Sequence, residues 1–156
     1  MSLKTAPVAR ASMLIRRPVS EVFKAFVDPT ITTQFWFTRA SGPLEQGAIV
    51  QWHWDFYGAS GEVFVRRVEL NTKIEWDWPS PVEFTFREFE ANSTFVSVLA
   101  TDFSGDDDEQ VAQALDSTEG FNLVLAACKV FLEQGINPRL IADKNPFAWV
   151  SSSVLN

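Results

Sequence analysis

Hydrophobic residues recur with a helical period in the last third of the chain. Between positions 117 and 134 they fall at spacings of three and four, which places them on one face of a helix. We expect Asp116 or Ser117 to cap the start of this helix and Gly135 to end it. A helix of about 18 residues is about 27 Å long, so it can cross a sheet of several strands. The apolar face comprises Phe121, Val124, Leu125, Cys128, Phe131 and Leu132.

Alternating apolar and polar residues predict β-strands upstream of this helix. Short turns join consecutive runs, a pattern typical of an antiparallel meander. The alternation slips at Arg66 and Arg67, which indicates a β-bulge. We therefore expect a sheet of about six strands. The runs cover 8–16, 49–56, 62–70, 72–78, 82–87 and 94–103.

Two short helices are predicted after the first strand. The first covers 19–27 and ends at Asp28-Pro29, because the residue before proline avoids the helical region. The second covers 30–37 and contains three adjacent aromatic residues. These point in different directions on a helix, so at least one must face a groove, a cavity or solvent. They are Phe35, Trp36 and Phe37.

These elements predict an α+β fold in which a curved antiparallel sheet wraps around one long C-terminal helix. Residues 1–156 form a single domain, with 1–7 and 136–156 as flanking tails of little regular structure. A short helix over 109–115 is expected to lead into the long one. The acidic run before it, 106–109, lacks the glycine and ligand spacing of a calcium loop and is interpreted as a solvated loop.

Composition and charge narrow the partners that we expect. The chain is 46% hydrophobic, and its net charge of -7 opposes nucleic acid or an anionic membrane surface as the main partner. The N-terminus lacks the apolar core of a signal peptide, and no run is long enough to insert into a membrane, so we expect a cytoplasmic protein. Cys128 is the only cysteine and His53 the only histidine, which does not suffice for a metal site. The scattered glycines form no phosphate-binding loop, so no cofactor is expected.

Aromatic residues occupy the strand positions that face the long helix. Their simplest interpretation is core packing. However, the four tryptophans on two strands bring four indole N–H donors, and a buried donor needs a partner. This favours a cavity that is open to a ligand. The candidate ligand-binding residues are Trp36, Trp52, Trp54, Trp76, Trp78, Phe84, Phe86, Phe121, Leu125 and Cys128.

The pattern contains no catalytic constellation. His53 has the parity opposite to Trp52 and Trp54, so it should point away from the cavity. Cys128 lies on the apolar stripe and is expected to be a buried, inert thiol. Glu69, Asp102 and Arg39 are the acids and bases that the pattern does not place. We therefore predict no catalytic residue.

The outward face of the sheet is less polar than a solvated face should be. Such a patch usually covers a partner, which suggests a homodimer through this face. The alternative is that the C-terminal tail, with Phe147 and Trp149, covers the patch. The outward apolar residues are Phe64, Phe89, Phe95 and Leu99.

Several segments together resemble the AHSA1-like (activator of Hsp90 ATPase homologue-like) family of the START-like or SRPBCC superfamily, which has the Bet v 1-like, helix-grip fold. They are RRPVSEVFKAFVDP at 16–29, the aromatic residues 35–37, Gly61-Glu62-Val63, IEWDW at 74–78, VEFTF at 82–86, the strand from Thr94 to Phe103, and Glu119-Gly120-Phe121. The resemblance implies a sheet curved around the last helix, with an apolar cavity that members use for lipids, polyketides or hormones.

Three functions remain open at this point. The first is binding of a small hydrophobic molecule, lipid-, polyketide- or aromatic-like, between sheet and helix. The second is a polyketide cyclase- or hydratase-like enzyme that uses the same cavity. The third is a protein-interaction module that acts on a chaperone or in a regulatory pair.

Overall fold

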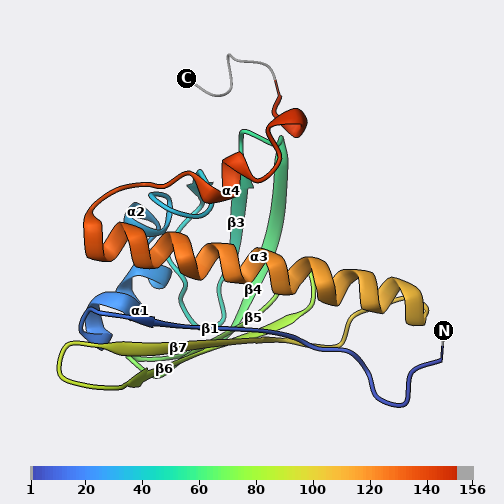
Figure 1. Cartoon of the computed structure of the whole chain (residues 1–156), viewed down its shortest axis with the longest axis horizontal. Helices are drawn as coiled ribbons and strands as arrows, with labels where there is room; N and C mark the ends of the chain where they lie inside the picture. The colour runs from blue at the N-terminus through green and yellow to red at the C-terminus, as the bar shows by residue number, and fades with distance from the viewer. Residues whose placement is uncertain (1, 151–156) are drawn as a thin grey trace.

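The structure is a computed structural model that describes residues 2–150 (Figure 1). It has the predicted α+β architecture, in which a long helix lies across an antiparallel sheet. Its elements are β1 Ala9–Ile15, α1 Val19–Val27, α2 Pro29–Thr32, β2 Arg39–Ala40, β3 Ile49–Trp54, β4 Ala59–Glu69, β5 Lys73–Asp77, β6 Pro81–Glu88, β7 Thr94–Ala100, α3 Asp107–Gln134, α4 Leu140–Asp143 and the 3-10 helix η1 Pro146–Ala148.

The seven strands form one open antiparallel sheet in the order β1-β7-β6-β5-β4-β3-β2. The meander from β3 to β7 was predicted. The strand that the sequence pattern missed is β2, which has two residues and is too short to show an alternation. The bulge is confirmed, because the register between β4 and β5 shifts between Val65 and Arg67. Both Arg66 and Arg67 are therefore exposed on the same side of the strand.

Helix α3 begins at Asp107, so the predicted start at Ser117 and the separate helix over 109–115 were wrong. Its cap is Asp106, whose carboxylate accepts a hydrogen bond from the Glu109 backbone N–H at 2.9 Å. Glu109 in turn accepts from the Asp106 N–H at 3.3 Å, which completes a capping box. The acidic run is thus the cap and first turn of a helix rather than a loop, and its carboxylates lie at the positive helix end.

The early start escaped the sequence pattern because residues 107–116 are mostly polar and carry no apolar stripe. Figure 1 shows why: the N-terminal half of α3 extends past the sheet toward the N-terminal segment. There the Leu3 backbone N–H donates to the Asp107 carboxylate at 3.0 Å. The end of the helix is as predicted, because Gly135 adopts the left-handed conformation with φ 71°.

The second short helix is also shorter than predicted, because α2 ends at Thr32 rather than Phe37. The chain leaves the helix to pair with β3, where the Thr38 N–H donates to the His53 carbonyl at 2.8 Å. The three adjacent aromatic residues therefore lie in the connection to β2. Phe35 and Phe37 are buried, whereas Trp36 is half-buried. Trp36 is thus the aromatic residue that does not enter the core completely.

The C-terminal segment 136–150 is more ordered than the predicted tail, because it contains α4 and η1. It crosses α3 and rises along the β3–β4 hairpin (Figure 1). The Tyr57 hydroxyl donates to the Ile141 carbonyl at 2.5 Å, and the Val150 N–H donates to the Phe56 carbonyl at 2.9 Å. The described tail therefore lies on the helix side of the sheet, and the alternative that residues 136–150 cover the outward face was wrong.

Candidate functional site: an aromatic pocket between sheet and helix

A pocket of about 290 Å³ lies between the concave face of the sheet, the middle of α3 and the C-terminal segment. We call it the aromatic pocket. Its walls come from β3 and β5 and the loops that follow them, from the connection after α2, from α3 and from α4 with its C-terminal end. The lining residues are Trp36, Trp52, Trp54, Tyr57, Trp76, Trp78, Pro79, Asp116, Ser117, Gly120, Phe121, Leu123, Val124, Ile141 and Lys144.

The structure brings together many of the candidate ligand-binding residues. Those that line the pocket are Trp36, Trp52, Trp54, Trp76, Trp78 and Phe121. Phe84, Phe86, Leu125 and Cys128 lie in the adjacent core instead and are buried. The rings of Phe26 and Trp76 cover Phe84, at centroid distances of 4.9 and 5.0 Å. Burial raises the pKa of the Cys128 thiol far above its usual range, so the thiol stays protonated.

The rings of the pocket wall pack against one another. Trp54 and Trp78 stack at 5.4 Å with an interplanar angle of 21°. Trp52 stacks on Phe37 at 4.8 Å and meets Trp76 edge to face at 5.2 Å. Such pairs contribute about 0.5–1.5 kcal/mol each beyond the area they bury. The aromatic residues therefore stabilise one another as a continuous wall.

Gly61 leaves the space that the ring of Trp78 occupies. It pairs with Trp52 across β3 and β4, on the strand face that points inward. A Cβ atom at this position would lie 2.1 Å from Cε2 of Trp78. The indole of Trp78 therefore lies directly on the glycine backbone, and no other residue leaves room for it.

The indole N–H groups of the pocket lack protein partners. Outside the pocket, the indole N–H of Trp149 donates a hydrogen bond to the Ala142 carbonyl at 2.7 Å. The five tryptophans of the pocket donate none within residues 2–150. The buried side-chain atom without a partner in that range is Asn71 Oδ1, so none of the five indole nitrogens is sealed in the core. Each of these nitrogens therefore keeps some access to solvent, and all five residues line the pocket.

Sequence reasoning missed the wall that comes from the C-terminal segment. Ile141 and Lys144 close one side of the pocket beside Tyr57 of the β3–β4 turn, whereas the sequence pattern predicts a tail of little regular structure over 136–156. Asp116 had been interpreted as a cap. Gly120 carried a usable signal, because a glycine in the interior of a helix costs about 1 kcal/mol relative to alanine. A Cβ atom there meets no other atom within 4 Å, which fits a helix face that looks into a hollow.

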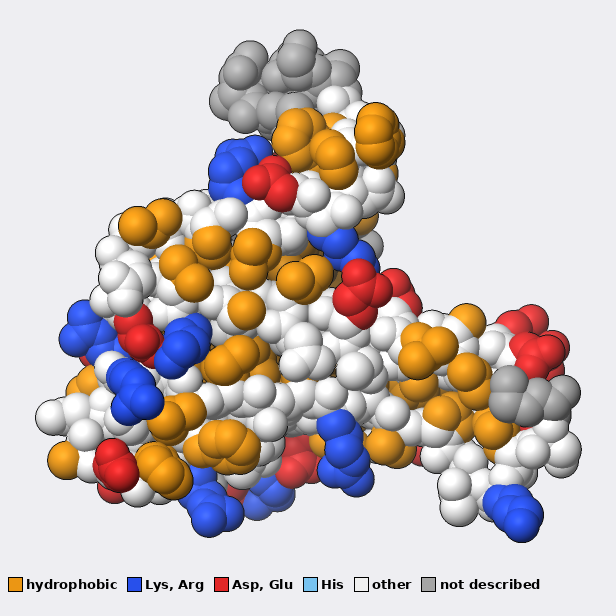
Figure 2. All heavy atoms as spheres, viewed as in Figure 1, with side chains coloured by type: hydrophobic (Ala, Val, Ile, Leu, Met, Phe, Trp, Pro, Cys, Tyr) orange, Lys and Arg blue, Asp and Glu red, His pale blue; other side chains and the backbone are white. Residues whose placement is uncertain are grey.

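Charged groups are confined to the edge of the pocket. Lys144 Nζ lies 3.3 Å from a Glu119 carboxylate oxygen and 3.9 Å from one of Asp116. The Asp116 side chain is 82% exposed, so these pairs contribute little to stability. Figure 2 shows basic and acidic groups side by side where the C-terminal segment meets the long helix. The positive charge of Lys144 is thus already balanced by acids.

The acids and bases that the sequence left unplaced lie elsewhere. Arg39 donates to both carboxylate oxygens of Asp55, at 2.8 and 2.9 Å, and thereby holds the pKa of Asp55 below its ordinary value. Glu69 pairs with Arg67, and Asp102 is exposed beyond the end of β7. His53 lies on the outward parity of β3 and does not line the pocket. Within residues 2–150, no three acidic, histidine or cysteine side chains converge as metal ligands would.

A second hollow, of about 310 Å³, lies on the other side of Trp36. Its lining includes polar residues such as Thr33, Thr38, Asp55 and Arg139. Trp36 and the α4 segment separate it from the aromatic pocket. No helix among residues 2–150 has the length and apolar character needed to cross a membrane.

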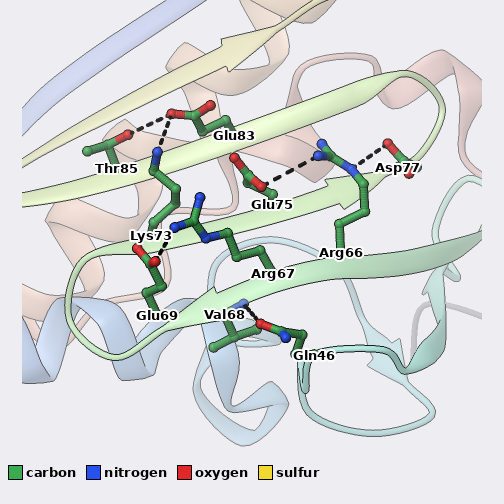
Figure 3. Close-up of polar contacts among 10 residues, drawn as sticks. All are labelled: Gln46, Arg66, Arg67, Val68, Glu69, Lys73, Glu75, Asp77, Glu83 and Thr85. Atoms are coloured by element: carbon green, nitrogen blue, oxygen red, sulfur yellow. Dashed lines mark hydrogen bonds and ion pairs between the residues drawn. The ribbon is translucent and has the colours of Figure 1, made fainter.

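The outward face of the sheet carries a charged ladder, which we define as Arg66, Lys73, Glu75, Asp77 and Glu83 (Figure 3). Arg66 bridges Asp77 at 2.8 Å and Glu75 at 3.5 Å, and Lys73 lies 3.2 Å from Glu83. The ladder runs across β4, β5 and β6. Each charge on it has an opposite charge within reach.

The register divides the outward apolar residues into separate groups. Phe64 pairs with Ile49 on β3 and with Asp77 on β5. Phe95 pairs with Leu14 on β1 and with Arg87 on β6. Leu99 is opposite Glu83, and the charged ladder lies between Leu99 and Phe64. The predicted apolar patch is therefore not continuous.

Known proteins share this architecture. Residues 16–133 match the model of the family described as Activator of Hsp90 ATPase homolog 1-like protein. No curated protein sequence matches the chain. The crystal structure of the protein SSP2350 from Staphylococcus saprophyticus is 34% identical, with a TM-score of 0.76, over 85% of this chain and 96% of that chain.

Two more distant structures share the fold. The solution structure of the Aha1 dimer from Colwellia psychrerythraea is 18% identical, with a TM-score of 0.68, over 82% of this chain and 97% of that chain. DynU16, described as a putative protein in the dynemicin biosynthetic locus, is 19% identical with a TM-score of 0.69, over 85% of this chain and 49% of that chain. With the family match over residues 16–133, these comparisons show that the chain belongs to the Activator of Hsp90 ATPase homolog 1-like family and has its helix-grip fold.

Proposed function

We propose that this protein binds a small hydrophobic molecule in the aromatic pocket. The observation that carries the proposal is an open hollow of about 290 Å³ with tryptophan walls, set against the buried aromatic core. Proteins generally pack their interiors as densely as organic crystals. A concave, mostly aromatic site with a few polar groups at its edge is the usual form of a small-molecule site.

The fold family is consistent with either ligand binding or a polyketide cyclase-like role. The arrangement of polar groups favours binding. The hydroxyl of Tyr57 is engaged with the Ile141 carbonyl, and Asp116 and Lys144 stand at the edge of the pocket. General acid–base chemistry needs a titratable group within hydrogen-bond reach of the reacting atom. The cyclase or hydratase alternative would gain support from turnover of a polyketide-like substrate.

The pocket is tested by filling it from the helix. Gly120→Leu adds a side chain where a Cβ atom meets open space, and it raises the helix propensity of α3. The probe is N-phenyl-1-naphthylamine, a neutral dye whose fluorescence rises in apolar surroundings. We expect saturable binding to the natural protein, retained binding to Gly120→Ala, and at least about ten-fold weaker binding to Gly120→Leu, the loss of about 1.4 kcal/mol.

Gly120→Ala is the matched control, because it raises the helix propensity of α3 without filling the pocket. Both variants should be at least as stable to denaturant as the natural protein, because both remove a mid-helix glycine. Equal dye binding by the natural protein and Gly120→Leu would contradict the proposal, and so would an absence of saturable binding to the natural protein.

We also retain the homodimer through the outward face as a proposal. Its support is the exposure of Phe64, Phe89 and Phe95, and a dimeric structural neighbour. The interface would have to cover the charged ladder, and burying paired charges is costly. A dimeric mass by light scattering at micromolar concentration, lost in Phe64→Asp, is the expected result. A monomeric mass for the natural protein would overturn the proposal.

Interaction with a chaperone remains the alternative to both proposals. It would be favoured if substitutions on the outward face, rather than in the pocket, abolished binding to a partner protein. The cytoplasmic location expected from the sequence also stays a prediction.

A further inference from the structure

We propose that the ligand of the aromatic pocket is an uncharged, flat aromatic molecule that presents hydrogen-bond acceptor oxygens, such as a ring ketone, rather than a plain hydrocarbon or a lipid tail. This inference rests on the proposed function, because it specifies the chemical class of molecule that the same pocket binds.

Three indole donors of the pocket belong to residues that are almost completely buried. Trp52 and Trp76 are each only 1% exposed, and Trp54 is 8% exposed, yet their N–H groups have no acceptor within residues 2–150. Trp36 and Trp78 add two more such donors to the same wall. A donor that is removed from water without a partner carries an uncompensated desolvation cost. A hydrocarbon that filled the pocket would expel water from these groups and offer nothing in return.

The protein offers few free acceptors near these donors. The Tyr57 hydroxyl is committed as a donor to the Ile141 carbonyl at 2.5 Å. The Ala142 carbonyl already accepts from Trp149. These two groups are thus already engaged, and the five indole N–H groups outnumber the acceptor side chains of the lining, which are Ser117 and Asp116 at its helix side. A ligand that completes the site must bring the acceptors.

The charge and shape of the pocket suit an uncharged, flat ligand. Lys144 is balanced by Glu119 and Asp116, and the chain carries a net charge of -7, so neither favours an anionic ligand. The volume of about 290 Å³ lies at the lower end of the range for ligand pockets, about 300 Å³. Flat faces such as those of the stacked pair Trp54 and Trp78 suit a molecule of two or three fused rings.

Two probes with the same ring skeleton, one with an acceptor oxygen and one without, test the need for an acceptor. 9-Fluorenone carries a ring carbonyl where fluorene carries a CH₂ group, and both are flat and uncharged. An apolar pocket would prefer fluorene, the more hydrophobic of the two. We expect the reverse, with 9-fluorenone binding about five-fold more tightly in calorimetric titration, as one net hydrogen bond would give.

Nuclear magnetic resonance of the indole N–H groups identifies the donor. In protein labelled with ¹⁵N, six tryptophans give six indole signals, assigned by single Trp→Phe variants. On addition of 9-fluorenone we expect at least one signal from Trp36, Trp52, Trp54, Trp76 or Trp78 to move downfield, and fluorene to cause no such shift. Trp149, whose N–H already donates to Ala142, is the internal control and should not move downfield.

The outcomes distinguish the two proposals. Tighter binding of 9-fluorenone together with a downfield indole signal supports the acceptor class. Binding of both probes with fluorene preferred, or without a downfield signal, overturns the acceptor inference and leaves the pocket standing. Binding of neither probe, with no binding of N-phenyl-1-naphthylamine, overturns the proposed function itself.

Discussion

The two faces of the sheet differ in whether their polar groups have partners. Along β5 the side chains of Ile74 and Trp76 point toward the helix, whereas Lys73, Glu75 and Asp77 point outward. On the outer face the charges of the ladder pair with one another (Figure 3). On the inner face the indole N–H groups have no partner within residues 2–150. The charges of the outer face are already paired within the protein. The indole N–H groups of the inner face are available to donate hydrogen bonds to a ligand.

The largest expected effect is on the inner face, at Gly61. Gly61→Ala places a Cβ atom 2.1 Å from the Trp78 ring, so the indole must move or the strands must separate. We expect a loss of about 2–3 kcal/mol in the free energy of unfolding, as for other overpacked sites. Chemical denaturation measures this loss. Strand propensity alone favours alanine over glycine, so it predicts the opposite sign.

A matched pair of controls isolates the contact with Trp78. Gly42→Ala, at a position where a Cβ atom meets nothing within 4 Å, should change stability by less than about 0.5 kcal/mol. In a Trp78→Leu background, Gly61→Ala should lose most of its cost, because the ring is gone. Additive effects of the two substitutions would show that the close approach is not what makes Gly61 necessary.

A smaller effect is expected at the start of α3, which carries the helix wall of the pocket. Asp106→Ala removes the capping box with Glu109 and should lower stability by about 1 kcal/mol. Asp116→Ala is the control, because Asp116 lies inside the helix with an exposed side chain. Thermal or chemical unfolding measures both. If Asp116→Ala were the costlier change, the helix would begin where the sequence pattern placed it.

Much of this comparison could be predicted from the sequence, because strand alternation has a period of two and fixes which residues share a face. It assigned Trp52, Trp54, Trp76 and Trp78 to the inner face, and it also found the bulge at Arg66 and Arg67. The order of elements and the final glycine of α3 followed from periodicity and cap chemistry. The α+β fold class is confirmed.

The rest depends on contacts between distant segments, which a local pattern does not contain. The polar first half of α3 is held by its cap and has no apolar stripe. The wall from Ile141 and Lys144 arises because the tail packs against Tyr57 and α3, more than 80 residues from Tyr57 in sequence. Phe84 shares the inward parity but lies deeper, where the ring of Trp76 covers it, and Leu125 of α3 is fully buried in the core.

On the outer face, removal of one ladder charge should cost little. Arg66→Gln breaks the pairs with Asp77 and Glu75, but the Arg66 side chain is 34% exposed, so water and salt replace much of the attraction. We expect a change of less than about 1 kcal/mol in the free energy of unfolding and unaltered dye binding. A large loss of dye binding would mean that the two faces are coupled.

The smallest effect is a pH dependence at Asp55, whose pKa is lowered chiefly by the hydrogen bonds from Arg39. A carboxyl group with a lowered folded pKa contributes stability that is present above its unfolded value, about 3.9, and is lost as the pH falls through the folded value. Arg39→Gln removes this contribution. Its stability deficit relative to the natural protein should therefore shrink as the pH falls below about 4, measured by denaturant unfolding at several pH values. If the stability deficit of Arg39→Gln stayed constant as the pH fell, the Arg39–Asp55 pair would make no pH-dependent contribution to stability.

The most direct test of the central claim is native mass spectrometry of the protein purified from its own host, before and after incubation with excess N-phenyl-1-naphthylamine. We predict a non-covalent adduct that is present under gentle conditions and absent under denaturing conditions, carried from the cell or formed with the dye, and missing in Gly120→Leu. The apo mass alone in all gentle spectra of the natural protein would contradict the claim that the aromatic pocket binds a small molecule.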